Sequence, residues 1–241
     1  MDYRTFVSGI TFTFLQPETF PSPEEQARFG ALAIERNVPF DVLNTTLPTD
    51  DDGTKRALEA ACRVPRMSTF AIAAMINRAV AEMPAHHAFV NIGVWNGFSL
   101  LAGMAGNDDR ICIGVDNFSD FGGPREDFGR RFQQHRSASH AFHDMDYRAY
   151  FEREHRAPIG VYFYDGDHSY EHQRLGLEIA APYFADDCII FVDDTNTHPA
   201  RAATYAFLIT HPGYRVLLDG RTCANGHPTW WNGVVVIQRG S

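Results

Sequence analysis

Aspartates follow two apolar runs of this sequence at the points where those runs end. Residues 161–171 read VYFYDGDHSYE, and residues 189–196 read IIFVDDTN. Aromatic and β-branched runs of this kind are typical of buried parallel strands, whose carboxyl ends meet at one edge of a sheet. Carboxylates crowded at that edge repel one another, so a divalent cation or a positively charged ligand would balance their charge. The acidic residues concerned are Asp165, Asp167, Asp193 and Asp194.

A glycine turn precedes these segments. Residues 91–99, NIGVWNGFS, place Gly93 and Gly97 between an apolar strand and a helix. Glycine lets the backbone approach a ligand closely, and a helix N-terminus offers free N–H groups to a carboxylate or phosphate. An ordinary tight turn explains the two glycines equally well, and the segment does not match the GxGxxG dinucleotide pattern.

Asp116 lies at the end of the next strand, where a carboxylate can accept hydrogen bonds from both hydroxyls of a ribose. Alternatively, Asp116 could cap a turn.

In this order and spacing, four segments resemble the class I S-adenosylmethionine-dependent methyltransferases: NIGVWNGFSLLAGMAG, GVDNF, YFYDGDHSYE and IIFVDDTN. More narrowly they resemble the metal-dependent O-methyltransferases of small molecules, of the macrocin and sugar O-methyltransferase type. The resemblance covers about residues 87–196. It implies a Rossmann-like α/β fold, S-adenosylmethionine as the methyl donor, and Mg²⁺ or Mn²⁺ as the metal.

The resemblance also implies roles for individual residues. The residues implied in donor binding are Asn91, Gly93, Gly97, Ser99, Asp116 and Asp144. Those implied as metal ligands are Asp165, Asp193 and Asp194. Asp167 and His168 both stand where such enzymes place a general base. The family commonly has Glu or Asp at the position of Asn91, which keeps an acceptor but lacks the charge.

The implied reaction makes chemical sense for these residue types. A hydroxyl must lose its proton, at least in part, to attack the methyl group of a sulfonium. A divalent cation lowers the hydroxyl's pKa, and His168, with a reference pKa near 6.5, could accept the proton. For Asp167, a place at a helix N-terminus before Ser169 explains the residue about as well.

Other functions remain open on the sequence alone. A nucleotide-sugar-dependent glycosyltransferase could use Asp165 and Asp167 as a DxD metal site, and a non-catalytic ligand-binding Rossmann protein could keep the same fold. Related enzymes hydroxylate instead of methylating. The acceptor, a sugar or a phenolic natural product, is not specified by any pattern, although a pocket with aromatic walls would indicate a phenol and one with polar walls a sugar.

Composition limits the partners and the location. The 21 Lys and Arg against 30 Asp and Glu give a formal charge of −9, which disfavours nucleic acid as a partner. We see neither a signal peptide nor a run long enough to span a membrane, and the four cysteines lack CxxC spacing and suggest reduced core thiols. We therefore expect a cytoplasmic protein that binds no membrane, with an apolar N-terminal segment that could join two copies into a homo-oligomer.

The expected fold is α/β: a Rossmann-like, doubly wound, mostly parallel sheet with a helical N-terminal extension (residues 1–84) and an antiparallel closing strand in a core domain (residues 85–241).

Local signals predict the individual elements. A capping box at Ser22 and Glu25 predicts a helix to about residue 37, and the aspartates at 50–52 predict a turn. Ser68 is expected to cap a helix that ends at residue 83. Between these, a helix is expected at 54–62. Strands are expected at 88–92, 111–115, 140–143, 161–164, 189–192, 214–218 and 234–238, and further helices at 98–105, 124–135, after Ser169 and at 199–210. In the helix after Ser169, Leu175, Ile179 and Tyr183 repeat at a four-residue interval. The loop at 219–233 is long enough for a lid or an acceptor contact. Trp230 and Trp231 could stack on a planar acceptor, but we expect them to pack under the last strand.

Overall fold

A seven-stranded sheet in the order β5-β4-β3-β6-β7-β9-β8 forms the centre of the computed structural model, which describes residues 1–240. Six strands run in the same direction, and only β9 runs opposite to them in this sheet. The strands are β3 (Ala88–Ile92), β4 (Ile111–Asp116), β5 (His140–Asp144), β6 (Ile159–Tyr164), β7 (Phe184–Val192), β8 (Tyr214–Gly220) and β9 (Val234–Arg239). The predicted Rossmann-like sheet with an antiparallel closing strand is confirmed.

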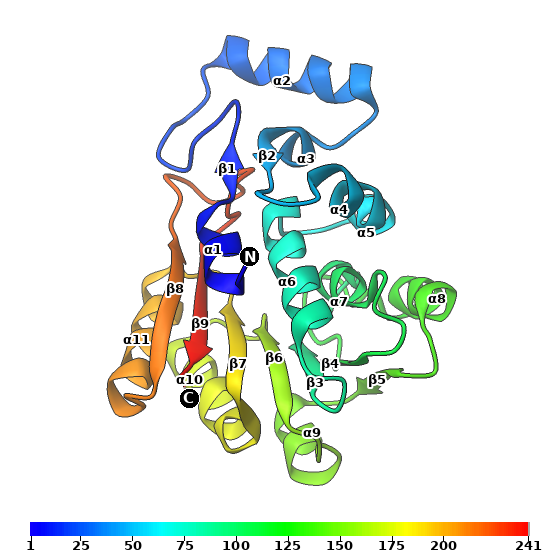
Figure 1. Ribbon diagram of the computed structural model, residues 1–241, viewed down its shortest axis with the longest axis vertical. Helices are drawn as coiled ribbons and strands as arrows, with labels where there is room; N and C mark the ends of the chain where they lie inside the picture. The colour runs from blue at the N-terminus through cyan, green and yellow to red at the C-terminus, as the bar shows by residue number, and fades with distance from the viewer. Residues whose placement is uncertain (241) are drawn as a thin grey trace.

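Helices cover both faces of the sheet (Figure 1). One face packs on α1 (Tyr3–Ser8), α6 (Phe70–Glu82), α7 (Phe98–Met104) and α8 (Arg125–His135). The other packs on α9 (Tyr147–Arg153), α10 (Tyr170–Ala180) and α11 (His198–Thr210). Successive strand residues point to opposite faces, so Phe89 lies in the first core and Val90 in the second, and both are fully buried. This two-sided burial explains why the central strands are continuous apolar runs.

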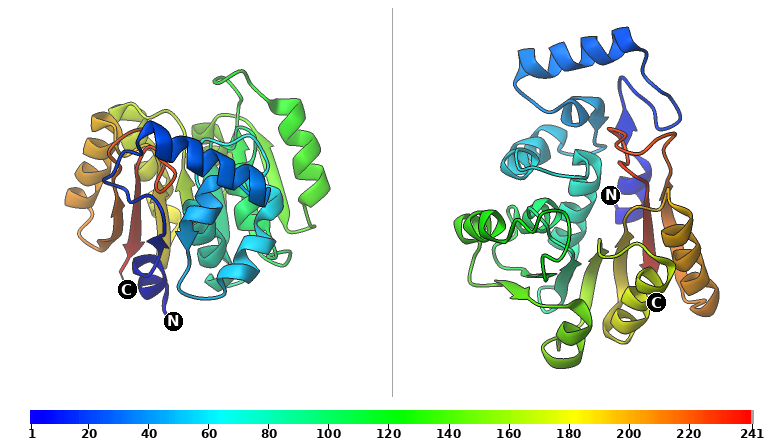
Figure 2. Two further views of the ribbon diagram at one scale, coloured as in Figure 1. Left: turned by 90° about the horizontal axis from the view of Figure 1, so that it is seen from above. Right: turned by 180° about the vertical axis from the view of Figure 1, so that it is seen from behind.

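The N-terminal residues lie across the carboxyl edge of the sheet (Figure 2). They form α2 (Pro23–Arg36), α3 (Phe40–Asn44), α4 (Asp51–Ala57), α5 (Glu59–Cys62) and a short ladder between β1 (Thr11–Phe12) and β2 (Thr45–Thr46). The backbone N–H of Cys223 donates to the carbonyl of Pro17 (2.9 Å), and His227 Nε2 lies 3.1 Å from the carbonyl oxygen of Thr19. These contacts tie the N-terminal arm to the loop between β8 and β9.

Local sequence signals predicted most of these elements. The capping box of Ser22 and Glu25 is present, and α2 ends at Asn37 in the left-handed conformation. Two predicted features are wrong. Asp51 and Asp52 open α4 instead of forming a turn, because acidic side chains suit the first turn of a helix. Thr69, not Ser68, occupies the N-cap position of α6.

Two further elements differ from the prediction. The single helix expected at 54–62 breaks at Leu58, which is fully buried between α4 and α5. Helix α9 follows β5 without having been predicted, although Asp146 caps it. The helix predicted after Ser169 is present as α10, whose buried residues include Gln173, Leu177 and Ala180, whereas Leu175 is 37% exposed.

The environment of the cysteines also departs in part from expectation. Cys62, Cys112 and Cys188 are free and buried, whereas Cys223 is exposed in the loop before β9.

Within residues 1–240, no helix combines the length and the apolar character that crossing a bilayer requires.

Candidate active site

The glycine turn after β3 is built on a buried amide. Asn91 is fully buried, its Oδ1 accepts a hydrogen bond from Ser99 Oγ (2.7 Å), and its Nδ2 donates to the carbonyl of Gly93 (2.9 Å). A carboxylate at this position could not donate to that carbonyl. Asn91 and Ser99, both predicted to bind the donor, thus form the frame that holds the turn in shape.

The turn presses directly against the first aspartate segment. Gly93 has φ of +76°, and a methyl group added there would collide with the carbonyl oxygen of Asp165. Gly97, at φ +97°, is the N-cap of α7. The two glycines are therefore required both for a left-handed backbone and, at Gly93, for the close approach of two loops at the carboxyl edge.

Asp116 closes the turn from the end of β4. Its Oδ2 accepts from the backbone N–H groups of Val94 (2.8 Å) and Trp95 (2.9 Å), and its Oδ1 accepts from Phe118 N (2.7 Å). These bonds are the turn-capping role that the sequence left as an alternative. A carboxylate has about four acceptor positions, so a ribose contact by Asp116 stays a prediction that would use the remaining capacity.

Asp144 lies exposed at the end of β5 and forms an ion pair with Arg125. The Arg125 guanidinium lies 5.2 Å from the ring centre of Phe118, whose ring packs on Phe142 at 5.7 Å. Trp95, which the sequence analysis did not assign, donates from Nε1 to the carbonyl of Phe121 (3.0 Å) and so joins the turn to this loop. An aromatic residue inside a glycine-flanked turn was the signal for it.

The structure brings the carboxylates after β6 and β7 together around one imidazole. His168 Nε2 lies 3.5 Å from Asp165 Oδ1 and 3.5 Å from Asp194 Oδ2. Burial disfavours the imidazolium, but the hydrogen bond to Asp165 and the surrounding carboxylate charges outweigh it and raise the pKa of His168 to about 9. In this arrangement the imidazolium is the cation that the crowded carboxylates require.

Asp193 is the most buried member of this cluster. It is 2% exposed, and its Oδ1 has no hydrogen-bond partner. Burial, together with the nearby charges of Asp165 and Asp194, raises its pKa well above the usual value of an aspartate. An unpartnered carboxylate oxygen of this kind fits a divalent cation, for which hard oxygen ligands are suited. No group of three or more His, Cys, Asp or Glu side chains is arranged as a metal site among residues 1–240, and His168 Nε2 lies 3.5 Å from a carboxylate oxygen of both Asp165 and Asp194.

The two candidate bases differ in position. Asp167 is exposed, and its Oδ1 accepts from Ser169 N (2.7 Å), a bond that lowers the pKa of the carboxyl group. This is the helix-capping arrangement that the sequence left open. His168 faces the cluster, and its Nδ1 lies 3.3 Å from Oε1 of the fully buried Gln173. Gln173 was not predicted, although a polar residue four positions before buried Leu177 was the available signal.

The loop between β8 and β9 reaches the cluster through Asn232, another residue that was not predicted. Burial raises the pKa of Asp194, and the nearby Asn232 side chain lowers it only in part. The Asn232 Oδ1 accepts from Gly226 N (2.8 Å). Trp230, 5% exposed, packs edge-on against Phe12 with ring centres 5.0 Å apart, so its predicted packing role is confirmed.

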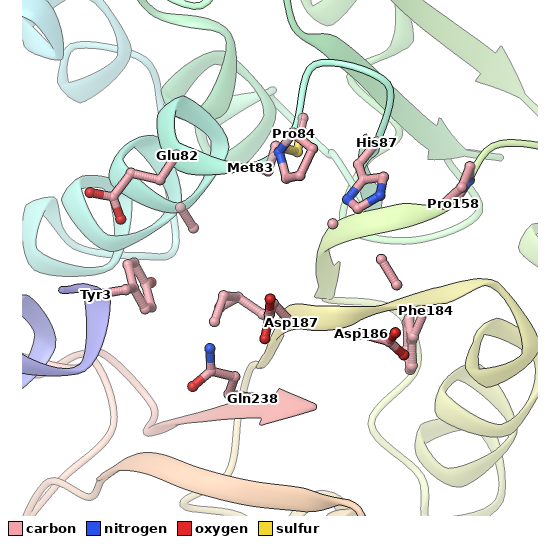
Figure 3. Close-up of a pocket in the computed structure, with 14 residues that line it drawn as sticks. Tyr3, Glu82, Met83, Pro84, His87, Pro158, Phe184, Asp186, Asp187 and Gln238 are labelled. Atoms are coloured by element: carbon pink, nitrogen blue, oxygen red, sulfur yellow. The ribbon is translucent and has the colours of Figure 1, made fainter. Parts of the chain in front are cut away.

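A cavity of about 680 Å³ lies at the opposite, amino edge of the sheet (Figure 3). Its walls include Glu82, His87, Asp186 and Asp187. The glycine turn and the aspartate cluster lie at the carboxyl edge, so we do not assign this cavity to the active site.

The sheet order, the glycine turn after β3 and the acid after β4 define the class I methyltransferase fold. Residues 90–195 match the family model of a methyltransferase domain. This match, which spans less than half of the chain, supports the prediction of a methyltransferase of this class. No curated protein sequence matches the chain.

Solved structures share the fold at low sequence identity. Cofactor-bound Rv0187 from MTB superposes with a TM-score of 0.58 at 15% identity, covering 92% of this chain and 99% of its own. The SAH-bound methyltransferase PaMTH1 from Podospora anserina superposes with a TM-score of 0.57 at 16% identity, covering 94% of this chain and 100% of its own. A protein from Staphylococcus aureus, provisionally assigned as a caffeoyl-CoA O-methyltransferase, superposes with a TM-score of 0.57 at 13% identity, covering 89% of this chain and 99% of its own.

Proposed function

We propose that the protein transfers a methyl group from S-adenosylmethionine to a hydroxyl of a small molecule, assisted by a divalent metal ion. The observation that carries this proposal is the contact between the glycine turn and the aspartate cluster. Gly93 packs against the backbone of Asp165, so a donor held on the turn would lie beside the groups that can activate an acceptor. The structures of PaMTH1 and Rv0187, with ligands in the same fold, support donor binding.

In the proposed reaction the acceptor oxygen attacks the methyl carbon, the carbon–sulfur bond breaks, and the sulfur keeps the electron pair. His168 accepts the hydroxyl proton at Nε2, while the Gln173 amide oxygen receives a hydrogen bond from Nδ1–H and fixes the ring. A divalent cation held by Asp165, Asp193 and Asp194 would lower the hydroxyl's pKa and offset the carboxylate charge that keeps His168 protonated. Fixed relative positions of donor and acceptor supply much of the remaining acceleration.

The glycosyltransferase alternative has less support. The family match covers the whole segment that contains Asp165 and Asp167, and the Asp167 carboxylate is engaged by Ser169 N at the start of α10. Between the two candidate bases, His168 is favoured because it faces the cluster. Asp167 serves in this proposal to hold the backbone of Ser169, which caps the helix that carries Gln173.

Calorimetry with S-adenosylmethionine, with and without Mg²⁺, tests the proposal. We expect one donor molecule to bind per chain, and Mg²⁺ to bind to the same protein sample. Absence of donor binding under both conditions would refute the proposed function.

Asp193→Asn tests the metal ligand without changing the shape of the side chain. We expect metal-stimulated turnover to fall on the order of 100-fold while the donor affinity measured without Mg²⁺ is retained, since removing a ligand charge weakens metal binding. Asp187→Asn is the control, because Asp187 is an exposed residue of β7 at the other edge of the sheet. Unchanged metal-dependent turnover in the Asp193 variant would exclude this residue as an essential ligand.

A further inference from the structure

We propose that a second cavity, of about 390 Å³, binds the planar aromatic ring of the methyl acceptor, and that the acceptor is therefore a phenol rather than a sugar. This inference rests on the proposed function, because it names the acceptor of that same site. The cavity lies between the N-terminal arm and the loop that precedes β9. Its lining residues include Phe20, Phe29, Gly30, Phe40, Asn225 and His227.

Aromatic rings form the walls of this cavity. Phe29 and Phe40 are stacked, with ring centres 4.5 Å apart and planes 18° apart, and Phe29 is only 5% exposed. Phe20 stands at the rim with 67% of its surface exposed. Large exposed aromatic side chains beside a hollow are typical of binding sites, and flat rings pack favourably on one another. The walls are thus suited to a flat, apolar ligand.

The polar side chains of the cavity are few and uncharged. They are Gln26 of α2 and Asn225 and His227 of the loop before β9, and no Asp, Glu, Lys or Arg is among the described residues that line the cavity. A sugar carries hydroxyls around its whole ring, and most of them would face Phe or Leu carbons here without a hydrogen-bond partner. A phenol presents far fewer hydroxyls, which matches the small number of polar side chains.

One side chain connects the cavity wall to the aspartate cluster. Gly226, which lines the cavity, donates from its backbone N–H to Asn232 Oδ1 (2.8 Å), and the Asn232 side chain lies near enough to Asp194 to lower the pKa of that carboxyl group. Asn232 therefore links the cavity wall to a proposed metal ligand. A ring seated in the cavity could direct a hydroxyl past Asn232 toward His168 and Asp194.

The cavity volume sets the size of the ligand. Small-molecule sites commonly measure about 300–1,000 Å³, so this one, near the lower limit, suits one or two fused rings. We choose 2,3-dihydroxynaphthalene as the probe, since it is planar, fluorescent and carries two adjacent hydroxyls. Methyl glucoside is the sugar probe for comparison.

Gly30→Leu fills the cavity with little risk to the fold. A Cβ on Gly30 meets no atom within 4 Å, and leucine favours the interior of helix α2 more than glycine does. Gly129→Leu is the matched control, because Gly129 lies within helix α8, away from this cavity, and also has open space at its Cβ.

We expect the wild-type chain to bind the naphthalenediol, by fluorescence titration, and to methylate it. In Gly30→Leu, the Kd and KM for this probe should rise at least tenfold while the affinity for S-adenosylmethionine is unchanged. Gly129→Leu should behave like the wild type. Light scattering on all three proteins checks their oligomeric state.

Equal binding and methylation of the naphthalenediol by wild type and Gly30→Leu would overturn the assignment of the cavity. So would methylation of the glucoside but not of the diol, or a change of oligomeric state in Gly30→Leu, which would show that a second copy fills the hollow. Probe binding needs no donor, so failure of the cavity assignment is distinguishable from absence of donor binding, which would refute the methyltransferase proposal.

Discussion

Gly93 and Gly106 share a backbone conformation but differ in their surroundings. Their φ angles are +76° and +72°, which side chains of L-residues rarely adopt. At Gly106 an added Cβ would enter open space, whereas at Gly93 it would collide with the Asp165 carbonyl. The pair separates the cost of the backbone conformation from the cost of forcing the two loops apart.

Gly106→Ala should lower the free energy of unfolding by about 1 kcal/mol, since only the left-handed conformation is penalised. Gly93→Ala should cost at least about 3 kcal/mol, or abolish donor binding where the loops move apart instead. Urea denaturation and calorimetry measure the two effects. Equal stabilities and equal donor affinities in the two variants would show that the loop contact is not needed.

At the scale of single elements, a buried histidine directly follows helix α9. His155 follows the helix and is 1% exposed, with Nδ1 2.8 Å from the hydroxyl oxygen of Tyr150 and its ring against Phe151 and Tyr183. Burial lowers the pKa of His155 to about 4. The unfolded chain therefore binds a proton at this residue at a higher pH than the folded chain does.

Because the folded pKa is below the unfolded one, His155 favours the folded state fully above about pH 6.5, and this contribution is lost as the pH falls toward 4. His155→Gln, which cannot protonate, should reduce the loss of unfolding free energy between pH 7 and pH 4.5 by about 2 kcal/mol. Exposed His198→Gln is the control. Denaturant titrations at the two pH values measure the free energy of unfolding. Identical losses in wild type and His155→Gln would show that His155 does not contribute to the pH dependence of stability.

Elements with strong local signals could be predicted, and those that depend on tertiary contacts could not. The apolar run of β3 and the capping box of α2 determine their elements almost alone. The face of α10 could not be read from spacing, because Gln173 occupies a buried position that only its contact with His168 explains. Asn232 likewise reaches Asp194 from a loop 38 positions further along the chain.

For the molecule as a whole, a buried ion pair joins the N-terminal residues to the core. Arg66 donates two hydrogen bonds to the Asp41 carboxylate (2.7 and 2.8 Å), and their side chains are 12% and 9% exposed. The same carboxylate accepts from Phe70 N at the start of α6 (2.6 Å), and the guanidinium lies 5.1 Å from the Phe98 ring. This pair had no signal in the sequence, because it depends on partners that are distant along the chain.

Asp41→Ala should destabilise the fold by about 3–5 kcal/mol, because it leaves the Arg66 charge buried without a partner. Glu59→Ala, which removes a pair whose side chains are 47% and 60% exposed, should cost less than about 1 kcal/mol. We expect a single thermal transition in both variants if residues 1–84 unfold together with the core. Two separate transitions would show that the N-terminal extension is an independent unit.

The backbone contact between Gly93 and Asp165 has a thermodynamic consequence. The turn proposed to hold the donor and the loop proposed to hold the metal cannot shift separately, so each ligand should alter the affinity for the other. Such coupling is reciprocal: if Mg²⁺ tightens the binding of S-adenosylmethionine by some factor, the donor must tighten the binding of Mg²⁺ by the same factor. A closed cycle of four calorimetric titrations would measure that factor from both directions, and the order in which the two ligands are added would not affect the sum.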